Sequence, residues 1–217
     1  MPTTNAKVAD FPPPTPVTRD GSRVRLREAT LADAEIVDAR AGDPVLHGEY
    51  NDFGMPKPPA LAENLADGKR MVRPDRGALL VVRIEDDAII GDIGWHTVSY
   101  GPNSESRALN IGLALIPDAR GKGYGTETQR LMGELLLDLF DIERVEASTD
   151  VENVAEQRSL EKAGFTREGV VRRAQFRAGT YHDLVTYSLV RSDLTSTDAD
   201  GLDVEADSRK ATRPGRT

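Results

Sequence analysis

The segment "LALIPDARGKGYGTETQRLMGELL" places three glycines at alternate positions between an apolar run and a stretch with helical spacing. Gly121, Gly123 and Gly125 carry no side chain, so the backbone there can turn tightly and approach a ligand closely. The helix that follows would present unpaired N–H groups and a partial positive charge, which together bind anions. Arg120 and Lys122 add positive charge. The pattern therefore predicts a phosphate-binding turn rather than a turn that needs glycine for its backbone alone.

Two familiar phosphate-binding loops do not match this turn. A Walker loop needs G-x-x-x-x-G-K-[ST], whereas here Lys122 precedes Gly123. A dinucleotide fingerprint needs G-x-G-x-x-G near the start of a βαβ unit, whereas this spacing is G-x-G-x-G and lies late in the chain. A dinucleotide-binding oxidoreductase is therefore a weaker interpretation.

The elements that would position the turn follow an α+β order. Strands are predicted from residue 23 to 27 and in the stretches "ALLVVRI", "AIIGDIGWHTV", "ALNIGLALI" and "RVEAST", with two closing strands at about 165–174 and 181–191. Helices are predicted after Thr30, near 61–65, along the apolar stripe that follows the glycine turn, and over "NVAEQRSLEKA", with Gly164 as its C-cap. One mixed sheet with helices is therefore expected, in a single domain over residues 22–193.

Composition limits the classes of function. The chain has 217 residues, a net charge of −8, three histidines and no cysteine, which excludes disulfides, thiolate metal sites and an acyl-cysteine intermediate and disfavours zinc. The acidic balance disfavours a nucleic-acid partner and is compatible with a cationic substrate, although its more common role is only to keep a protein soluble. The apolar runs are too short to cross a bilayer and no secretory signal is visible, so we expect a cytoplasmic protein without a membrane partner. Residues 1–21 are rich in proline and residues 194–217 in small and acidic residues, so we expect both to be disordered.

The run "RGKGYGT" after "IPDA", together with "NVAEQRSLEKAGF" further along, resembles the GNAT acyltransferases. It is most similar to their RimJ/RimL-type branch, which N-acetylates ribosomal-protein termini and many other amines. The resemblance covers about residues 23–191. It implies the GNAT fold, a mixed and mostly antiparallel central sheet flanked by helices, with strands splayed at the coenzyme A (CoA) site. It also implies acetyl-CoA as acyl donor, an amine acceptor, no metal, and a monomer or homodimer.

The resemblance also implies a set of CoA-binding residues. In the family the loop binds the pyrophosphate through backbone amides, and the preceding strand pairs with the pantetheine arm as an extra strand would. The family's asparagine and serine after the next strand fall on Asn153 and Ser159, although Asn153 can equally be the N-cap of its helix. The implied CoA-binding residues are Leu113, Ala114, Leu115, Arg120, Gly121, Lys122, Gly123, Tyr124, Gly125, Thr126, Asn153 and Ser159.

Acylation of an amine by a thioester needs a group that takes the amine proton, a donor for the oxyanion, and a proton or hydrogen bond for the departing thiolate. A backbone N–H near Leu115 is the natural oxyanion donor. Many family members use a tyrosine as general acid one residue beyond the serine, where this chain has Leu160. Ser159 is therefore our candidate to hydrogen-bond the CoA sulfur, and a solvent-facing helix serine is the alternative.

The proton acceptor is harder to place. A subset of the family has a glutamate base in the strand before the loop, where this chain has Asn110. We take Glu105 as the catalytic candidate for proton removal. Ordered water and three further side chains stay open, namely Asp92, His96 and Glu49. Trp95 and Tyr50 are expected to line the acceptor pocket, although a lone tryptophan is more often a core residue, and Asp183 resembles a family aspartate with a structural role.

The sequence thus predicts an acetyl-CoA-dependent N-acetyltransferase that transfers an acetyl group to a primary amine, on a small molecule or a protein N-terminus, by direct attack in a ternary complex. Leu160 and Asn110 support an alternative, a non-catalytic acyl-CoA sensor or interaction module on the same fold.

Overall fold

The computed structural model describes residues 16–41, 43–54, 60–69 and 71–196. The elements, in chain order, are β1 (Thr18–Asp20), β2 (Val24–Arg27), the 3-10 helix η1 (Leu31–Asp33), α1 (Ala34–Arg40), α2 (Pro44–His47), α3 (Leu61–Ala66), β3 (Arg76–Arg83), β4 (Ala88–Ser99), β5 (Arg107–Leu115), the 3-10 helix η2 (Pro117–Ala119), α4 (Tyr124–Leu139), β6 (Arg144–Asp150), α5 (Val154–Lys162), β7 (Thr166–Arg177), β8 (Thr180–Val190) and α6 (Arg191–Ser196).

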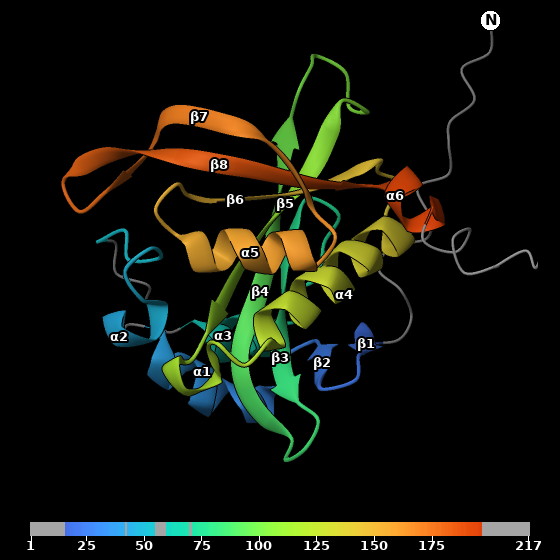
Figure 1. The fold of residues 1–217 in the computed structure, drawn as a ribbon. Coiled ribbons are helices and arrows are strands. Elements are labelled where there is room, and N and C mark those ends of the chain that lie inside the picture. The colour runs from blue at the N-terminus through green and yellow to red at the C-terminus, as the bar shows by residue number, and fades with distance from the viewer. Residues whose placement is uncertain (1–15, 42, 55–59, 70, 197–217) are drawn as a thin grey trace, which may run out of the picture.

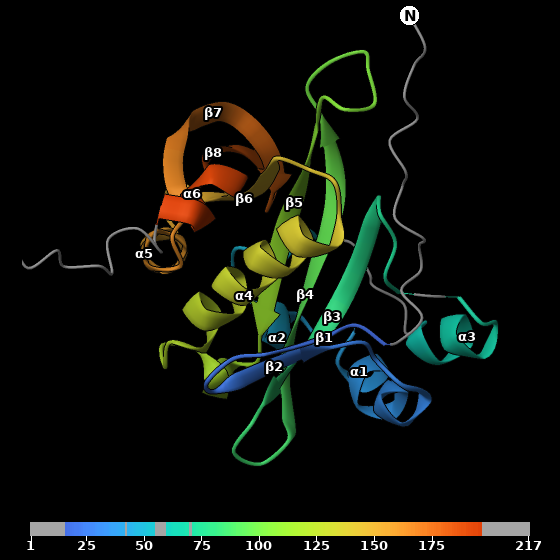
Figure 2. The ribbon, with the colours of Figure 1, turned by 90° about the vertical axis from the view of Figure 1, so that its right-hand side faces the viewer.

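All eight strands form one sheet in the order β1-β2-β3-β4-β5-β6-β8-β7. The pairs are antiparallel except for β5 and β6, which run parallel because the connection between them contains helix α4. Helices α4 and α5 cover one face of the sheet, and α1 and α3 cover the other (Figures 1 and 2). The predicted α+β fold with a mixed, mostly antiparallel sheet is confirmed.

The core lies between α4 and the sheet. The apolar stripe predicted after the glycine turn is buried, with Met132 and Leu136 fully enclosed against Leu109 of β5 and Val145 of β6 in one cluster. Leu160 of α5 belongs to the same cluster, so α4 and α5 are both anchored to the centre of the sheet. The two helices on this face are therefore fixed relative to strands β5 and β6.

Strands β5 and β6 pair over only three residues and then diverge. Their parallel register joins Leu109, Asn110 and Ile111 to residues 145–147. Beyond that point β6 continues to Asp150, paired with β8. Residues 112–115 of β5 are paired with β4 only. The predicted splay of the strands is thus present, and it leaves one backbone edge of β5 open at its C-terminal end.

The N-terminal boundary differs from the expected one. Strand β1 lies within segment 1–21, which we expected to be a disordered arm, and it pairs with β2 in antiparallel register. Val17 is buried, and the turn after β1 is fixed by Glu127 of α4, whose carboxylate accepts hydrogen bonds from the backbone N–H groups of Ser22 and Arg23. Residues 16–21 therefore belong to the domain, because a buried apolar residue and ladder bonds outweigh the proline-rich composition around them.

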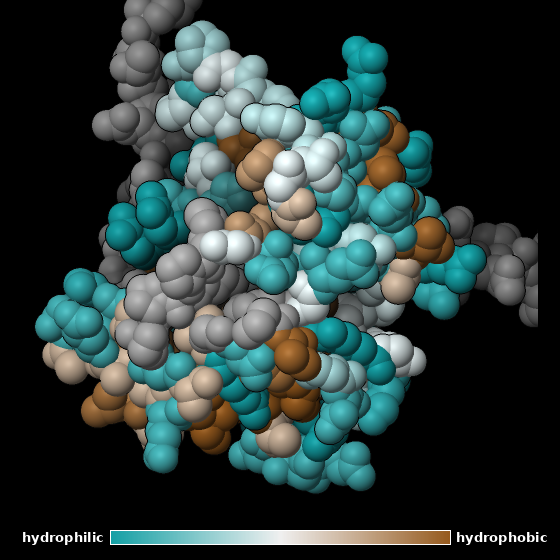
Figure 3. Space-filling view, turned by 90° about the vertical axis from the view of Figure 1, so that its left-hand side faces the viewer, coloured by the Kyte–Doolittle hydropathy of each residue, from teal (hydrophilic) through white to brown (hydrophobic). Residues whose placement is uncertain are grey.

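At the other end, α6 runs to Ser196, three residues beyond the expected end at 193. Segments 1–15 and 197–217 lie outside the described residues. Within the described ranges, no helix has the length and apolar character needed to cross a membrane. The face shown in Figure 3 carries separate apolar patches among polar side chains.

Candidate active site

The glycine turn connects η2 to α4 and has the backbone conformation that its residues predict. Gly121 has φ of +70° and Gly123 has φ of +81°, both in the left-handed region that side chains disfavour. Gly123 is the N-cap of α4, so the free N–H groups of the first helical turn lie directly after it. The turn therefore presents backbone donors at a helix N-terminus.

Gly125 matters for space rather than for its backbone angles. A Cβ at this position would lie 3.4 Å from the Leu113 side chain and 3.6 Å from Ser159 Oγ. Because Gly125 has no side chain, the first turn of α4 can lie close to β5 and α5 without filling the space between those two elements. A cleft can therefore run from the glycine turn into the space between the two strands.

The Arg120 side chain is exposed but is hydrogen-bonded to two backbone carbonyls. Its Nε donates to the Leu115 carbonyl oxygen over 2.8 Å, and its Nη2 donates to the carbonyl oxygen of Leu46 in α2. Lys122 is exposed, and its carbonyl oxygen accepts a hydrogen bond from Arg23. The Arg23 guanidinium lies 4.5 Å from the centre of the Tyr124 ring. The side chains around the loop thus tie it to β5, α2 and β2.

A cleft of about 580 Å³ begins at the loop and passes between β5 and α5. It contains cationic side chains from two elements, Arg120 in the loop and Arg158 and Lys162 on α5, so its walls carry positive charge although the chain is acidic. Its described lining is Gly48, Glu49, Tyr50, Asn51, Leu113, Leu115, Arg120, Gly121, Gly123, Gly125, Thr126, Asn153, Ala155, Glu156, Arg158, Ser159 and Lys162.

The cleft adjoins a narrower cavity of about 90 Å³, here called the notch, at the point where β5 and β6 diverge. Asn51, Leu113, Asn153 and Glu156 line both cavities. The notch is otherwise lined by Ile111, Gly112, Gln129, Ala147, Ser148 and Thr149.

Along the open edge of β5, the backbone groups of successive residues point alternately toward the cleft and toward β4. The Leu113 carbonyl oxygen accepts a 3.4 Å hydrogen bond from the Asn51 side chain, and the Leu115 carbonyl oxygen accepts from Arg120, so both carbonyls face the cleft. The carbonyl of Ala114 is directed at β4 instead, since a Cβ on Gly91 would lie 2.2 Å from it. Of the three strand residues expected to bind pantetheine, only Leu113 and Leu115 offer backbone groups to the cleft.

Helix α5 begins with the cap that was left open as an alternative for Asn153. Its Oδ1 accepts from the backbone N–H of Glu156 over 3.3 Å, and its Nδ2 donates to Thr149 Oγ1 over 3.0 Å. The second bond joins the start of α5 to β6. Asn153 is therefore an N-cap and also a lining residue of the cleft.

A chain of four polar side chains crosses from α4 to α5. Ser159 Oγ donates to Gln129 Oε1 over 2.8 Å, and Thr126 Oγ1 lies 3.1 Å from Ser159 Oγ. The other end of Gln129, its Nε2, donates to the carboxyl of Glu156. The one hydroxyl proton of Ser159 is directed at Gln129, so the hydroxyl is engaged within the protein, while the half-buried side chain also lines the cleft.

Burial raises the pKa of Glu156 to about 7, although the hydrogen bond from Gln129 acts in the opposite direction. A carboxyl group of this kind exchanges its proton near neutral pH. Across the described chain, no group of three or more His, Asp or Glu side chains is arranged to hold a metal ion.

Several residues singled out in the sequence do not meet at the cleft. Glu105 lies in the exposed loop between β4 and β5, and the strand from Arg107 to Leu113 alone spans about 20 Å, so Glu105 is not placed to accept a proton there. Glu49 and Tyr50 do line the cleft. The residues outside its described lining are Ala114, Lys122, Tyr124, Glu105, Asp92, His96, Trp95, Asn110, Leu160 and Asp183.

Three of these residues have other structural roles. Trp95 is a core residue whose Nε1 donates to the Arg73 carbonyl oxygen, which is the common role of a lone tryptophan rather than a pocket wall. Leu160 is fully buried. Asp183 accepts a hydrogen bond from the backbone N–H of Arg173 over 2.7 Å, which agrees with the structural role expected for it.

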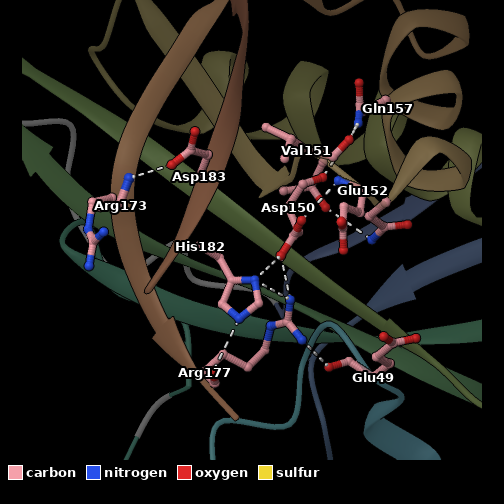
Figure 4. A network of polar contacts seen from close by, with 11 residues as sticks. Glu49, Asp150, Val151, Glu152, Gln157, Arg173, Arg177, His182 and Asp183 are labelled. Atoms are coloured by element: carbon pink, nitrogen blue, oxygen red, sulfur yellow. Dashed lines mark hydrogen bonds and ion pairs between the residues drawn. The ribbon is translucent and has the colours of Figure 1, made fainter. Parts of the chain in front are cut away.

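A buried ionic cluster supports the segment on the far side of the cleft (Figure 4). The Arg177 guanidinium at the end of β7 is hydrogen-bonded to Asp150 of β6, and it also donates to the Glu49 carbonyl oxygen over 3.1 Å. It lies 5.2 Å from the centre of the Tyr50 ring. His182 Nδ1 is 3.1 Å from the same Asp150 carboxylate. Arg177 thus connects the central sheet to the residues that close the cleft.

The sequence reasoning missed Glu156, Gln129, Asn51, Arg158 and Lys162. Arg158 and Lys162 carried a usable signal, because a spacing of four places both on one side of α5. Glu156 was concealed by its position three residues after a helix cap, where glutamate is common. Asn51 lies in the irregular region between α2 and α3, for which no periodicity exists.

Comparison with known proteins gives a consistent result. Residues 23–166 match the family model described as acetyltransferase (GNAT) domain. The N-acetyltransferase YoaA of Bacillus subtilis (strain 168), itself uncharacterized, is 26% identical over 170 residues, which cover 78% of this chain and 94% of that protein.

Solved structures show the same fold. RimJ of Mycobacterium smegmatis, in complex with CoA-disulfide, superposes with a TM-score of 0.65 at 19% identity, over 83% of this chain and 88% of that one. RimL, a ribosomal alpha-N-protein acetyltransferase in complex with coenzyme A, has a TM-score of 0.63 at 18% identity, over 78% and 95%. This protein, with its glycine loop, splayed strands and cleft, belongs to the GNAT acetyltransferase family.

Proposed function

We propose that this protein transfers an acetyl group from acetyl-CoA to a primary amine, by direct attack of the amine within a ternary complex. One observation carries the proposal. The open backbone edge of β5 runs from a glycine turn at a helix N-terminus to a notch where two strands part. A donor with a phosphate group, an arm of amides and a terminal thioester matches these three parts in that order.

Different residues of the chain would bind different parts of the donor. Backbone N–H groups after Gly121 and Gly123 would hold the pyrophosphate, and the cations Arg158 and Lys162 lie on the facing helix. The backbone groups of Leu113 and Leu115 would pair with the amides of pantetheine. For that pairing, Asn51 would have to release the Leu113 carbonyl.

The acceptor would enter from the side of Glu49 and Tyr50, which line the cleft. The amine must be neutral to attack, and its nitrogen must lose a proton once the new bond forms. An N–H on the open edge of β5 would donate to the oxygen of the tetrahedral intermediate. The proposal leaves open whether the amine belongs to a small molecule or to a protein N-terminus.

Two measurements test this function. Isothermal titration calorimetry should show acetyl-CoA binding, and acetyl-CoA with a panel of amines should release free CoA thiol. The panel would contain spermidine, a lysine-containing peptide with a blocked N-terminus, and peptides with free N-terminal Ala, Ser or Met. A thiol reagent reads this release directly, because the chain has no cysteine of its own. Binding without thiol release for any amine would instead support the sensor, which the buried Leu160 at the family's tyrosine position favours.

A further inference from the structure

Among the described residues that line the notch, Glu156 is the one titratable side chain. Every other described residue of that lining is apolar, a glycine, or a neutral amide or hydroxyl. The notch is where the open edge of β5 ends, so under the proposed function it receives the thioester. A carboxyl group in this position is the available proton acceptor closest to the reacting atoms.

The ordinary explanation for a glutamate at this position is helix capping. Asn153 at the N-cap and Glu156 three residues later match a capping box, in which the glutamate would bond back to the N-cap N–H. That N–H instead donates to the Asp150 carbonyl oxygen over 2.9 Å. The Glu156 side chain crosses to α4 and meets Gln129. Capping therefore accounts for Asn153 and leaves the carboxyl of Glu156 without a structural purpose at the helix start.

The polar chain behind Glu156 is built to hold this carboxyl in one place. Gln129 is almost fully buried, and both ends of its amide are engaged, by Ser159 at Oε1 and by Glu156 at Nε2. Ser159 itself lies beside Gly125, nearer the glycine turn, and is absent from the lining of the notch. The hydroxyl of Ser159 therefore fixes Gln129, and Gln129 fixes one oxygen of Glu156.

We infer that Glu156 is the proton-transfer residue of the acetyl transfer, and that Gln129 and Ser159 are positioning residues that act through it. The inference rests on the proposed function. The amine nitrogen bonds to the thioester carbon while the π electrons of the carbonyl move to its oxygen. The Glu156 carboxylate takes the proton that the nitrogen loses. The C–S bond then breaks with its electron pair on sulfur, and Glu156 returns the proton to the thiolate. The products are the amide and CoA thiol, with the carboxylate regenerated.

One carboxyl can serve both steps, because nitrogen and sulfur are attached to the same carbon in the intermediate. Gln129 of α4 contacts Glu156, and Leu113 of β5 and Thr149 of β6 line the notch with it; all three are uncharged. The charged groups along the adjoining cleft are Glu49, Arg120, Arg158 and Lys162. Asp150, the next charged residue on β6, is paired with Arg177. Burial raises the pKa of Glu156 to about 7, and the hydrogen bond from Gln129 only partly opposes it.

The test compares the wild type with Glu156→Gln and with the control Glu143→Gln, in which the same charge is removed from a side chain that is 83% exposed at the start of β6. For whichever amine of the panel turns over, we expect Glu156→Gln to lower kcat by about 10²–10³-fold. Its KM for acetyl-CoA and its melting temperature should not worsen. Glu143→Gln should match the wild type.

The pH profile separates proton transfer from a merely structural role. An amine with a pKa near 10 is mostly protonated below pH 9, so log kcat/KM rises with slope one from that cause alone. In the wild type, protonation of Glu156 should add a second unit of slope below about pH 7. In Glu156→Gln the slope should stay at one throughout. An unchanged kcat, or a wild-type profile retained in Glu156→Gln, would overturn the assignment.

Two further outcomes keep this inference distinct from the proposed function. If the wild type binds acetyl-CoA but releases no thiol with any amine, the proposed function fails and the inference fails with it. If the wild type turns over and Ser159→Ala loses more kcat than Glu156→Gln, acetyl transfer stands but Ser159 acts directly and the assignment of Glu156 is wrong. A ¹³C titration of the Glu156 carboxyl that gave a pKa near 4.5 would also refute it.

Discussion

Arg120 donates a hydrogen bond from its Nε to the carbonyl oxygen of Leu115, and this bond joins the glycine turn to the last residue of β5. Because the guanidinium also bonds to Leu46, its contribution is to hold the loop in place rather than to attract a phosphate across solvent. Arg120→Ala should therefore weaken acetyl-CoA binding by about tenfold at both low and high salt. Calorimetry at 50 mM and 500 mM NaCl checks this, because a purely ionic contact would lose most of its effect at the higher ionic strength.

The glycine turn allows a matched pair of variants. Gly121 and Gly68 share a φ of +70°, and a Cβ added at either position meets nothing within 4 Å. Valine at each position should therefore cost a similar amount of stability from backbone strain, of order 1–2 kcal/mol. Only Gly121→Val should also weaken acetyl-CoA binding, by more than tenfold, since it alone lies in the cleft. If the two folded variants bound acetyl-CoA with equal affinity, the assignment of the glycine turn to the donor site would be wrong.

Glu156 should make the protein less stable as the pH rises. Burial raises the pKa of its carboxyl from 4.5 to about 7, so between these values the native state binds more protons than the unfolded state. The free energy of unfolding therefore falls as the pH rises through this window, and the full cost is present above pH 7. At 1.36 kcal/mol per unit, the cost is at most about 3 kcal/mol.

Glu156→Gln does not titrate and should escape this cost. Urea denaturation should find the variant more stable than the wild type at pH 8 and nearly equal to it at pH 5. The comparison is independent of any acceptor. A variant that was less stable at pH 8 would show that the carboxylate makes a favourable contact in the folded protein.

The Arg177–Asp150 pair is almost completely buried, with side chains 5% and 1% exposed. Burial alone would raise the pKa of Asp150, but hydrogen bonds from the Glu152 N–H and from Arg177, with the positive charge of Arg177, lower it below its usual value. Arg177→Met would leave a buried carboxylate with one partner fewer and should cost about 3–5 kcal/mol in the free energy of unfolding. The double variant Arg177→Met, Asp150→Leu should recover part of this loss, and two additive losses in urea denaturation would contradict the coupling.

The domain boundary can be tested by truncation. We propose residues 16–196 as the folded unit, since β1 pairs with β2 and Val17 is buried. Protein that starts at residue 16 should melt like the full chain, whereas protein that starts at residue 22 should melt several degrees lower. Acetyl-CoA affinity should fall as well, because Glu127 in the first turn of α4 would lose the Ser22 and Arg23 contacts beside the loop. If the two truncated proteins melted at the same temperature, the folded unit would begin at residue 22 and not at residue 16.

The sequence predicted those features that depend on local patterns. The glycine spacing, the stripe on α4 and the stop at Gly164 follow from backbone conformation and periodicity, and the structure has all three. It could not predict which way each strand residue faces, so Ala114 was grouped with Leu113 and Leu115. Pairing β5 with β4 decides that question, and pairing is a non-local property.

Glu105 and Glu156 illustrate the same limit for the site. Glu105 was the catalytic candidate from the sequence, yet the strand carries it away from the cleft. Glu156 stands where a capping-box glutamate would stand, and only the positions of Gln129 and Asp150 show that its carboxyl is directed elsewhere. A side chain's partner across two helices cannot be read from spacing along one of them.

The divergence of β5 from β6 also sets the length of the open strand edge. The open edge from Gly112 to Leu115 is four residues long, which corresponds to about 13 Å between the notch and the glycine turn. An acyl donor is held at both ends only if its chain spans that length. Short thioesters of N-acetylcysteamine would reach the notch without an anchor at the loop, and longer carriers would bring the thioester past the place where the strands part. Under the proposed function, the geometry of this strand edge would therefore select the donor by its length, before any contact with the acyl group is made.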